Sequence, residues 1–180
     1  MKSEITTKRG FTIVEILVVL VIISILVIGS VPFIGRAQAD ARDDRREADI
    51  AIITAALERY YQDNGEYPSA QGSSVINTYW STTADSSWEY LRDQLVPKYI
   101  DELPSDPSGE TGKAAISTGL AYDYYANGWT YCGKAVRQMY LLAYNFENRE
   151  RKVTLIGECS TNVLGPYGGS SNHRVARDNT

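Results

Sequence analysis

The chain has 180 residues, the length of one domain with an appendage, and its 43% hydrophobic and 22% charged residues are ordinary for a globular protein. These values exclude a disordered chain and a fibrous repeat. The net charge of −4 and the lack of any run of five Lys or Arg disfavour a surface that binds nucleic-acid phosphates. One histidine, His173, excludes His-dependent triads and His-rich zinc sites, and two cysteines cannot complete a Cys-rich metal site.

Residues 11–28 form an apolar run that contains only three polar residues, Thr12, Glu15 and Ser24. Three basic residues precede it: Lys2, Lys8 and Arg9. The positive-inside bias therefore places the N-terminus in the cytoplasm and the chain after the run outside. As a helix, the run would reach about 27 Å, close to the hydrocarbon thickness of about 30 Å. The sequence predicts one membrane span.

Three interpretations of this run remain open. It is a cleaved secretory signal with Gly29 and Ser30 after its core, a plain single-pass anchor, or a segment in which Glu15 has a special role. The run is long for a secretory signal, and its flank lacks an Ala-x-Ala site.

Glu15 is the unusual residue of the run, because a carboxylate inside a bilayer costs about 2.5–3.5 kcal/mol and is usually paired. No basic residue lies within residues 11–28. Cutting the chain after Gly10 would place a new amine on Phe11, one helical turn from Glu15 and within reach of a neighbouring copy. Such a pair is satisfied in only one stagger of the helices, so Glu15 would set their register. The alternative is a lone Glu15 that snorkels to the membrane edge or stays protonated.

The segment Lys8–Leu17 resembles the cleavage signature of type IV pilins and pseudopilins: a short basic leader, Gly, then Phe-Thr and a Glu four residues beyond the Phe. The resemblance implies that an aspartic prepilin peptidase of the membrane cuts after Gly10 and N-methylates Phe11. It further implies polymerisation with other copies and other pilins at an inner-membrane assembly platform. Ile13 and Val14 stand where Leu-Ile is more usual.

A long helix continues beyond the run. Residues 36–61 contain no Gly or Pro, and an apolar face recurs at helical spacing through Ile50, Ile53, Leu57 and Tyr60. Asn64-Gly65 is a stop signal. The sequence therefore predicts a helix from Phe11 to about Asp63, roughly 80 Å long.

Gly29, Pro32 and Gly35 predict a kink within this helix, because proline removes a backbone hydrogen bond and clashes with the preceding turn. The simpler alternative is a bend at the membrane exit. The pilin resemblance implies that the stretch loosens when subunits pack into a filament.

The segment from Asp40 to Asp49 mixes three arginines with five acidic residues. One interpretation is a solvated helix face with internal ion pairs. The other is charge matching between subunits of a filament.

The rest of the chain predicts a small sheet. Residues 65–87 form an irregular connection, residues 87–96 a short helix, and residues 120–126, 138–146 and 152–156 three strands, with a turn at 148–150 between the last two. The fold class is α+β, a long N-terminal helix packed against a small antiparallel β-sheet head, which resembles pilins. The segment Tyr60–Pro68 also resembles the end of the helix in that family.

Leu103–Gly109 is a turn-dense segment that is similar to the Leu-Pro-x-Asp-Pro-Trp-Gly motif of secretion pseudopilins, with Ser108 in place of Trp. Those pseudopilins bind calcium in a following loop. Carboxylates that would supply oxygens here are Asp101, Glu102, Asp106, Glu110 and Asp123. Their spacing is not that of an EF-hand, and turn formation is the alternative role. No other metal or cofactor is predicted.

Cys132 and Cys159 enclose a loop that would face an oxidising compartment. A disulfide there would contribute roughly 3–4 kcal/mol, and free buried thiols are the alternative. In pilins, a C-terminal disulfide commonly frames an exposed variable region, which would here be residues 133–158.

We therefore predict a structural precursor subunit of a type IV pilus or pseudopilus and not an enzyme. Its parts are a leader (1–10), a transmembrane and filament-core segment (11–35), a head (36–160) and a flexible tail (161–180). It would sit in the inner membrane, N-terminus inside and head outside, in contact with lipid until it enters a periplasmic or extracellular filament at the cell surface. The alternative is a secreted or membrane-anchored binding domain with an ordinary signal or anchor segment.

Overall fold

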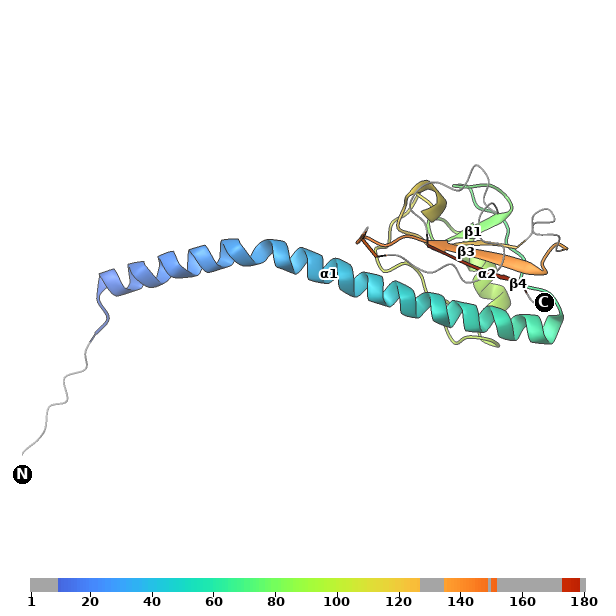
Figure 1. The fold of residues 1–180 in the computed structure, drawn as a ribbon, viewed down its shortest axis with the longest axis horizontal. Helices are drawn as coiled ribbons and strands as arrows, with labels where there is room; N and C mark the ends of the chain where they lie inside the picture. Colours follow the sequence, from blue (N-terminus) through green and yellow to red (C-terminus); the bar gives the residue numbers. More distant parts are fainter. Residues whose placement is uncertain (1–9, 127–134, 149, 152–172, 179–180) are drawn as a thin grey trace, which may run out of the picture. The chain divides into compact units, whose positions relative to one another are not determined.

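The computed structural model describes residues 10–126, 135–148, 150–151 and 173–178 (Figure 1). Its elements are helix α1 (Ile13–Asn64), strand β1 (Trp80–Thr82), helix α2 (Trp88–Leu95), the 3₁₀ turn η1 (Ala115–Ser117) and strands β2 (Asp123–Tyr125), β3 (Met139–Tyr144) and β4 (His173–Asp178). The chain divides into two compact units, residues 1–38 and 39–180.

Helix α1 is continuous over 52 residues and ends where the sequence predicts. Gly65 follows with a φ of 72°, and its N–H donates to the carbonyl of Tyr61 (2.8 Å). Glycine adopts this left-handed conformation without the penalty that a side chain would bring, so it ends the helix.

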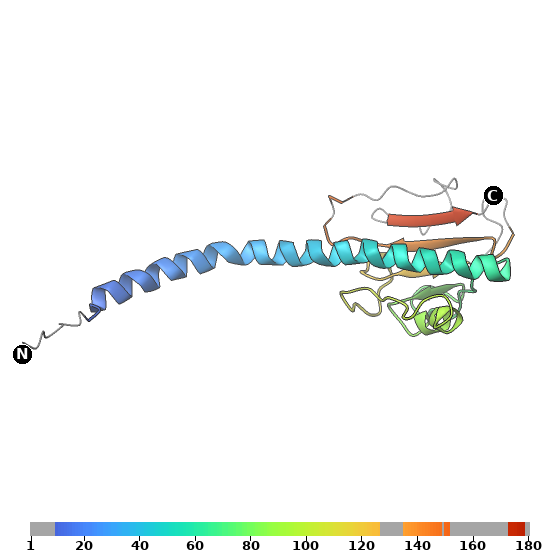
Figure 2. The same ribbon diagram turned by 90° about the horizontal axis from the view of Figure 1, so that it is seen from below.

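The second unit, residues 39–180, which is called the head from here on, contains a four-stranded antiparallel sheet in the order β1-β2-β3-β4. Its register pairs Tyr124 with both Ser81 and Leu142, and Tyr140 with Arg177. All six residues of β3 are buried, so both faces of the central strand are covered. Figure 2 shows β3 and the C-terminal part of α1 running alongside each other.

The larger core lies between this sheet and α1. Ile50, Ile53 and Leu57 of the helix join Tyr124 and Tyr140 of the sheet in one buried cluster, to which α2 adds Trp88, Leu91 and Leu95. A second cluster on the other face gathers Trp80, Ala114, Ile116, Leu141 and Ala143. The predicted fold class, a long helix against a small antiparallel sheet, is confirmed.

Two details of the sheet differ from the sequence prediction. Strand β1 lies within what the sequence presents as an irregular connection, and residues 173–178 form β4 where a flexible tail is predicted. Strand β1 has only three residues, and β1 and β4 both pair with strands that lie far away in the sequence, so no local pattern indicates them. The predicted strand at 152–156 lies outside the described residues.

Candidate assembly site

The predicted cleavage position lies just before helix α1. Gly10 and Phe11 are exposed and precede the first helical residue, Ile13, and nothing lies within 4 Å of the position that a Cβ on Gly10 would take. The bond between Gly10 and Phe11 is therefore outside the helix and open to an approaching protein.

Thr12 and Glu15 cap the start of the helix. The Glu15 N–H donates to Thr12 Oγ1 (3.2 Å), and Glu15 Oε2 accepts from the Thr12 N–H (3.1 Å) and from Thr12 Oγ1 (3.0 Å). This reciprocal arrangement is a capping box, in which the two side chains satisfy backbone donors at the helix start. Glu15 thus has a partner in its own chain, which the sequence analysis missed although the pattern Thr-x-x-Glu signals it.

The helix after the cap is covered with exposed apolar side chains. Every hydrophobic residue from Phe11 to Val27 is exposed, from 49% for Ile16 to 82% for Phe11. The remaining polar residue, Ser24, donates its hydroxyl to the carbonyl of Leu20 (2.7 Å). This half of α1 therefore has its polar groups engaged within its own helix and its apolar groups unburied.

In the part of the chain that is described, no helix combines the length and the apolarity needed to cross a membrane. The predicted membrane span is therefore not confirmed.

Gly29, Pro32 and Gly35 all lie within the unbroken helix α1. The backbone is helical through all three, and a Cβ on Gly35 would meet nothing within 4 Å. The structure shows no interruption of the helix there, and a kink or loosening during assembly stays a prediction.

The charged segment of α1 is anchored inside the head by Arg46, whose side chain is completely buried. Its guanidinium donates twice to the carboxylate of Asp106 (2.7 and 2.9 Å), and also to Asp43 (2.6 Å) and Glu147 (2.9 Å). Burial opposes its charged form, but the hydrogen bonds and charges of these three carboxylates raise the pKa of Arg46 above its ordinary value. Charge-assisted hydrogen bonds to all three carboxylates therefore hold the Arg46 guanidinium in place.

Two further contacts make this cluster a junction of three segments. Arg42 donates two hydrogen bonds to the carboxylate of Glu147 (2.7 and 2.5 Å). The carboxylate of Asp43 accepts hydrogen bonds from the backbone N–H groups of Glu147 (3.0 Å) and Asn148 (2.9 Å). The cluster ties α1 to the loop at Asp106 and to the loop after β3. The charges of Arg42, Asp43 and Arg46 are therefore paired within the chain, but the predicted solvated helix face is wrong for Asp43 and Arg46, which are completely buried under the two loops.

The candidate calcium ligands are engaged separately. Asp106 binds Arg46, and the fully buried Asp123 accepts from Thr82 Oγ1 (2.5 Å) and from the Ile116 N–H (2.9 Å), while Asp101 lies exposed in another loop. Burial raises the pKa of Asp123 to about 7. No group of three metal-binding side chains is found among the described residues. Asp101, Asp106 and Asp123 are not brought together.

Cys132 and Cys159 lie outside the described residues, so their pairing stays a prediction.

The sequence analysis did not identify Arg46 as an anchoring residue, although the sequence contains a signal for it. Asp43 and Arg46 continue the spacing of the apolar face formed by Ile50, Ile53 and Leu57, and a charge on the buried face of a helix indicates a buried partner.

Comparison with known proteins identifies the same N-terminal segment, which contains the predicted cleavage position and the start of α1. A family model described as the prokaryotic N-terminal methylation motif matches residues 5–31. The type II secretion system core protein G of Pseudomonas aeruginosa is 33% identical over 124 residues, which are 67% of this chain and 83% of that protein. The protein of the same name from Klebsiella pneumoniae is 33% identical over 103 residues, 57% of this chain and 70% of the relative.

No solved structure gives a significant match. The methylation motif covers the cleavage position, the cap and the exposed apolar half of α1, and the similarity to the core proteins G extends beyond them into the head. The chain therefore belongs to the pilin and pseudopilin family.

Proposed function

We propose that the chain is the precursor of a structural subunit that polymerises into a pseudopilus of the type II secretion kind. Removal of residues 1–10 and N-methylation of Phe11 would give the mature subunit. The main support is the run of exposed apolar side chains that begins directly after the cleavage position. A face of that size on a single chain is a surface that requires a partner.

Two environments would cover this face in succession. Before assembly, lipid of the inner membrane would surround it, with the N-terminus inside and the head outside. After assembly, the same half of α1 from other copies would replace the lipid and form the core of the filament. The capping box supports such a transfer, because the hydrogen bonds between Thr12 and Glu15 lie within one chain and would need no partner in either environment.

Glu15 would fix the register of the assembled helices. Cleavage creates an amine on Phe11, and in a surrounding of low dielectric this cation would pair with Glu15 of an adjacent copy. The prepilin peptidase and an assembly platform in the inner membrane are the partners that this pathway requires. The similarity to type II secretion system core proteins G favours a role in secretion over motility or adhesion.

N-terminal sequencing and intact mass of the protein purified from cells test the proposal. The expected mature chain starts at N-methylated Phe11. A chain that starts near Val31 or keeps Met1 would instead indicate a secreted or membrane-anchored binding domain. Electron microscopy with antibodies to the head then shows whether the chain runs along whole filaments, as a major subunit does, or labels only their tips.

A further inference from the structure

The end of α1 carries the pair Asn64-Gly65, a combination of residues that favours chemical self-modification of a peptide chain. An asparagine followed by glycine converts readily to a cyclic imide, because glycine has no side chain to obstruct the reaction. Both residues are exposed, and no described atom lies within 4 Å of the position that a Cβ on Gly65 would take. Water therefore reaches the pair, and burial does not protect it.

The reaction needs only these two residues and water. The backbone nitrogen of Gly65 attacks the Cγ carbon of Asn64, so that a nitrogen–carbon bond forms and the Cγ–Nδ2 bond breaks with release of ammonia. Water then opens the imide at either carbonyl and leaves aspartate or isoaspartate at position 64. The first step requires that the Gly65 nitrogen gives up its proton and that the Asn64 side chain turns onto it.

Hydrogen bonds in the folded chain oppose both requirements. The Gly65 N–H donates to the carbonyl of Tyr61 (2.8 Å), which engages the attacking nitrogen. The two hydrogens of Asn64 Nδ2 go to the carbonyl of Tyr60 (2.7 Å) and to the hydroxyl of Tyr99 (2.9 Å). An amide group has two donor hydrogens, so both are used. These bonds fix the Asn64 side chain in one orientation.

Tyr99 is the residue from outside the helix that completes this arrangement. Its ring is buried and packs on Tyr60, with 5.1 Å between the ring centroids. Its hydroxyl accepts from Asn64 (2.9 Å) and Lys98 Nζ (2.9 Å) and donates to Asp63 (3.3 Å). A hydroxyl offers one donor and two acceptor positions, so the Tyr99 hydroxyl is fully used.

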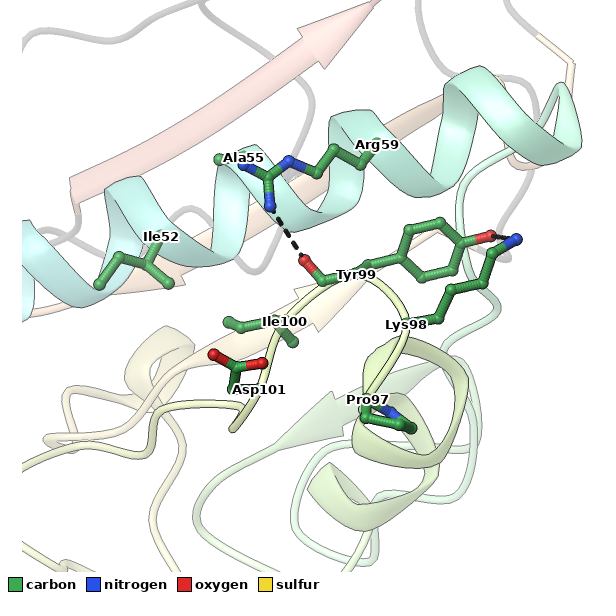
Figure 3. A pocket seen from close by; sticks show the side chains of 8 residues that line it. All are labelled: Ile52, Ala55, Arg59, Pro97, Lys98, Tyr99, Ile100 and Asp101. Carbon is green, nitrogen blue, oxygen red and sulfur yellow. Dashed lines mark hydrogen bonds between the residues drawn. The ribbon is translucent and has the colours of Figure 1, made fainter.

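Figure 3 shows how the loop that carries Tyr99 meets α1. The Tyr99 carbonyl accepts a hydrogen bond from Arg59 of the helix (3.3 Å). A hollow of about 330 Å³ lies between Ile52, Ala55 and Arg59 of the helix and the loop Pro97–Asp101. This hollow leaves the loop room to move, and its displacement would withdraw the Tyr99 hydroxyl from Asn64.

We infer that Asn64-Gly65 is a latent self-modification site, which the folded head keeps unreactive through Tyr99 and which converts to aspartate or isoaspartate when the helix end opens. The product has no side-chain N–H to donate to Tyr60 or Tyr99, and it adds a negative charge beside Asp63. A chain that has opened once therefore stays open at its helix end. The inference concerns the head alone and goes beyond the proposed polymerisation.

Peptide mass spectrometry of the full chain tests the inference, with incubation in detergent at mildly alkaline pH and detection of the conversion at position 64. Conversion in the folded chain is expected to be at least about tenfold slower than in guanidinium chloride, because several hydrogen bonds must open before the attack. In guanidinium chloride the second Asn-Gly pair of the sequence, Asn127-Gly128, serves as an internal standard. Equal rates at Asn64 in the folded and denatured chains would overturn the inference.

A variant of Tyr99 tests which group provides the protection. Tyr99→Phe keeps the ring and removes the hydroxyl, and is expected to speed conversion of the folded chain about fivefold, the effect of one lost hydrogen bond. Tyr90→Phe is the matched control, because the Tyr90 hydroxyl contacts Ser69 instead. It is expected to convert at the unaltered rate. Failure of Tyr99→Phe to convert faster than Tyr90→Phe would overturn the inference.

Hydrogen exchange separates local opening from unfolding of the whole head. In Tyr99→Phe the amides of Ile53 and Leu57, in the buried core, are expected to exchange as in the unaltered chain. Equal acceleration of exchange there would assign the faster conversion to global unfolding and would overturn a local role of Tyr99.

The aspartate product is reproduced by Asn64→Asp. This variant is expected to speed hydrogen exchange of the Gly65 amide, whereas Gln62→Glu, which adds the same charge at another exposed position of the last turn, is expected to leave it unchanged. Unaltered exchange in Asn64→Asp would show that the modified chain closes again and would overturn the lasting effect of the modification.

Discussion

Thr12 and Glu15 bind each other at the start of α1: the Thr12 hydroxyl and N–H both donate to one carboxylate oxygen, and the Glu15 N–H donates back to the Thr12 hydroxyl. The residue that the sequence presents as an acid without a partner is thus already oriented by its own helix. These bonds hold its carboxylate at the helix start.

Loss of the capping hydroxyl should loosen the first helical turn. Thr12→Ala is expected to cost about 1 kcal/mol of local helix stability, because one N-cap acceptor is removed. Hydrogen exchange of the amides from Ile13 to Ile16, measured in detergent, should accelerate. Thr12→Ser keeps the oxygen and should exchange like the unaltered chain, and identical exchange in Thr12→Ala would contradict a capping role.

Removal of the acid itself should separate insertion from assembly. Glu15→Ala is expected to insert into the membrane normally, since it removes a polar group from an apolar helix, but to yield few filaments, since the register contact is lost. Ser24→Ala is the matched control, because the Ser24 hydroxyl bonds only within its own helix. A normal filament yield from Glu15→Ala would refute the register role, and the Thr12→Ala variant measures how much of any loss comes from the cap.

The buried guanidinium should be the most sensitive point of the head. Arg46→Met leaves Asp43, Asp106 and Glu147 close together without their shared cation, which is expected to lower the free energy of unfolding by about 3–5 kcal/mol. Arg42→Met, which removes a partly exposed arginine, should cost much less, because solvent screens its pair with Glu147. Urea denaturation of the full chain in detergent compares the two. Equal losses of unfolding free energy in the two variants would show that the burial of Arg46 does not determine how much its ion pairs stabilise the head.

The buried carboxyl of Asp123 should make the head less stable as the pH rises. Burial raises its folded-state pKa to about 7, whereas in the unfolded chain it titrates near its ordinary value of about 4. Its contribution to stability is therefore complete below pH about 4 and is lost as the pH rises to about 7, a change on the order of 4 kcal/mol.

Asp123→Asn removes this titration. The difference in unfolding free energy between the unaltered chain and the variant should fall between pH 4 and pH 7 and level off above that range. Comparing the two chains cancels groups that shift in the opposite direction, such as Glu147, whose pKa the hydrogen bond from Arg42 lowers. A difference that does not change with pH would contradict a buried ionisable Asp123.

Cys132 and Cys159 are expected to form a disulfide. Reduction should then lower the free energy of unfolding by roughly 3–4 kcal/mol and slow the chain on a non-reducing gel. Mass spectrometry of peptides under non-reducing conditions locates the bond. Two alkylated thiols in the protein taken directly from cells would show that the bridge is absent.

The sequence predicted elements that depend on local patterns. Helix α1 was placed within two residues at its start and one at its end, because apolar spacing and Asn64-Gly65 are local signals. Strands β2 and β3 also fall inside the predicted segments. Alternation around Tyr122 and Tyr124 indicates β2, and the β-prone residues of 138–146 indicate β3.

Contacts between distant segments were not predictable in this way. Arg46 meets Asp106 and Glu147, 60 and 101 residues further along the chain, and nothing near Arg46 specifies those partners. Strand β4 likewise depends on its register with β3, which has no local signature. At the assembly site the residues were predicted from the motif, but the hydrogen bonds between Thr12 and Glu15 required the structure.

The ionic junction at Arg46 also has a mechanical consequence. In the filament that we propose, a pull along its length would reach the head through the segment of α1 around residue 46. Because Arg46 of α1 binds Asp106 and Glu147 on two separate loops, several charge-assisted hydrogen bonds must break before the helix separates from the rest of the head. We expect the unit to resist shear at this clasp and to yield elsewhere first.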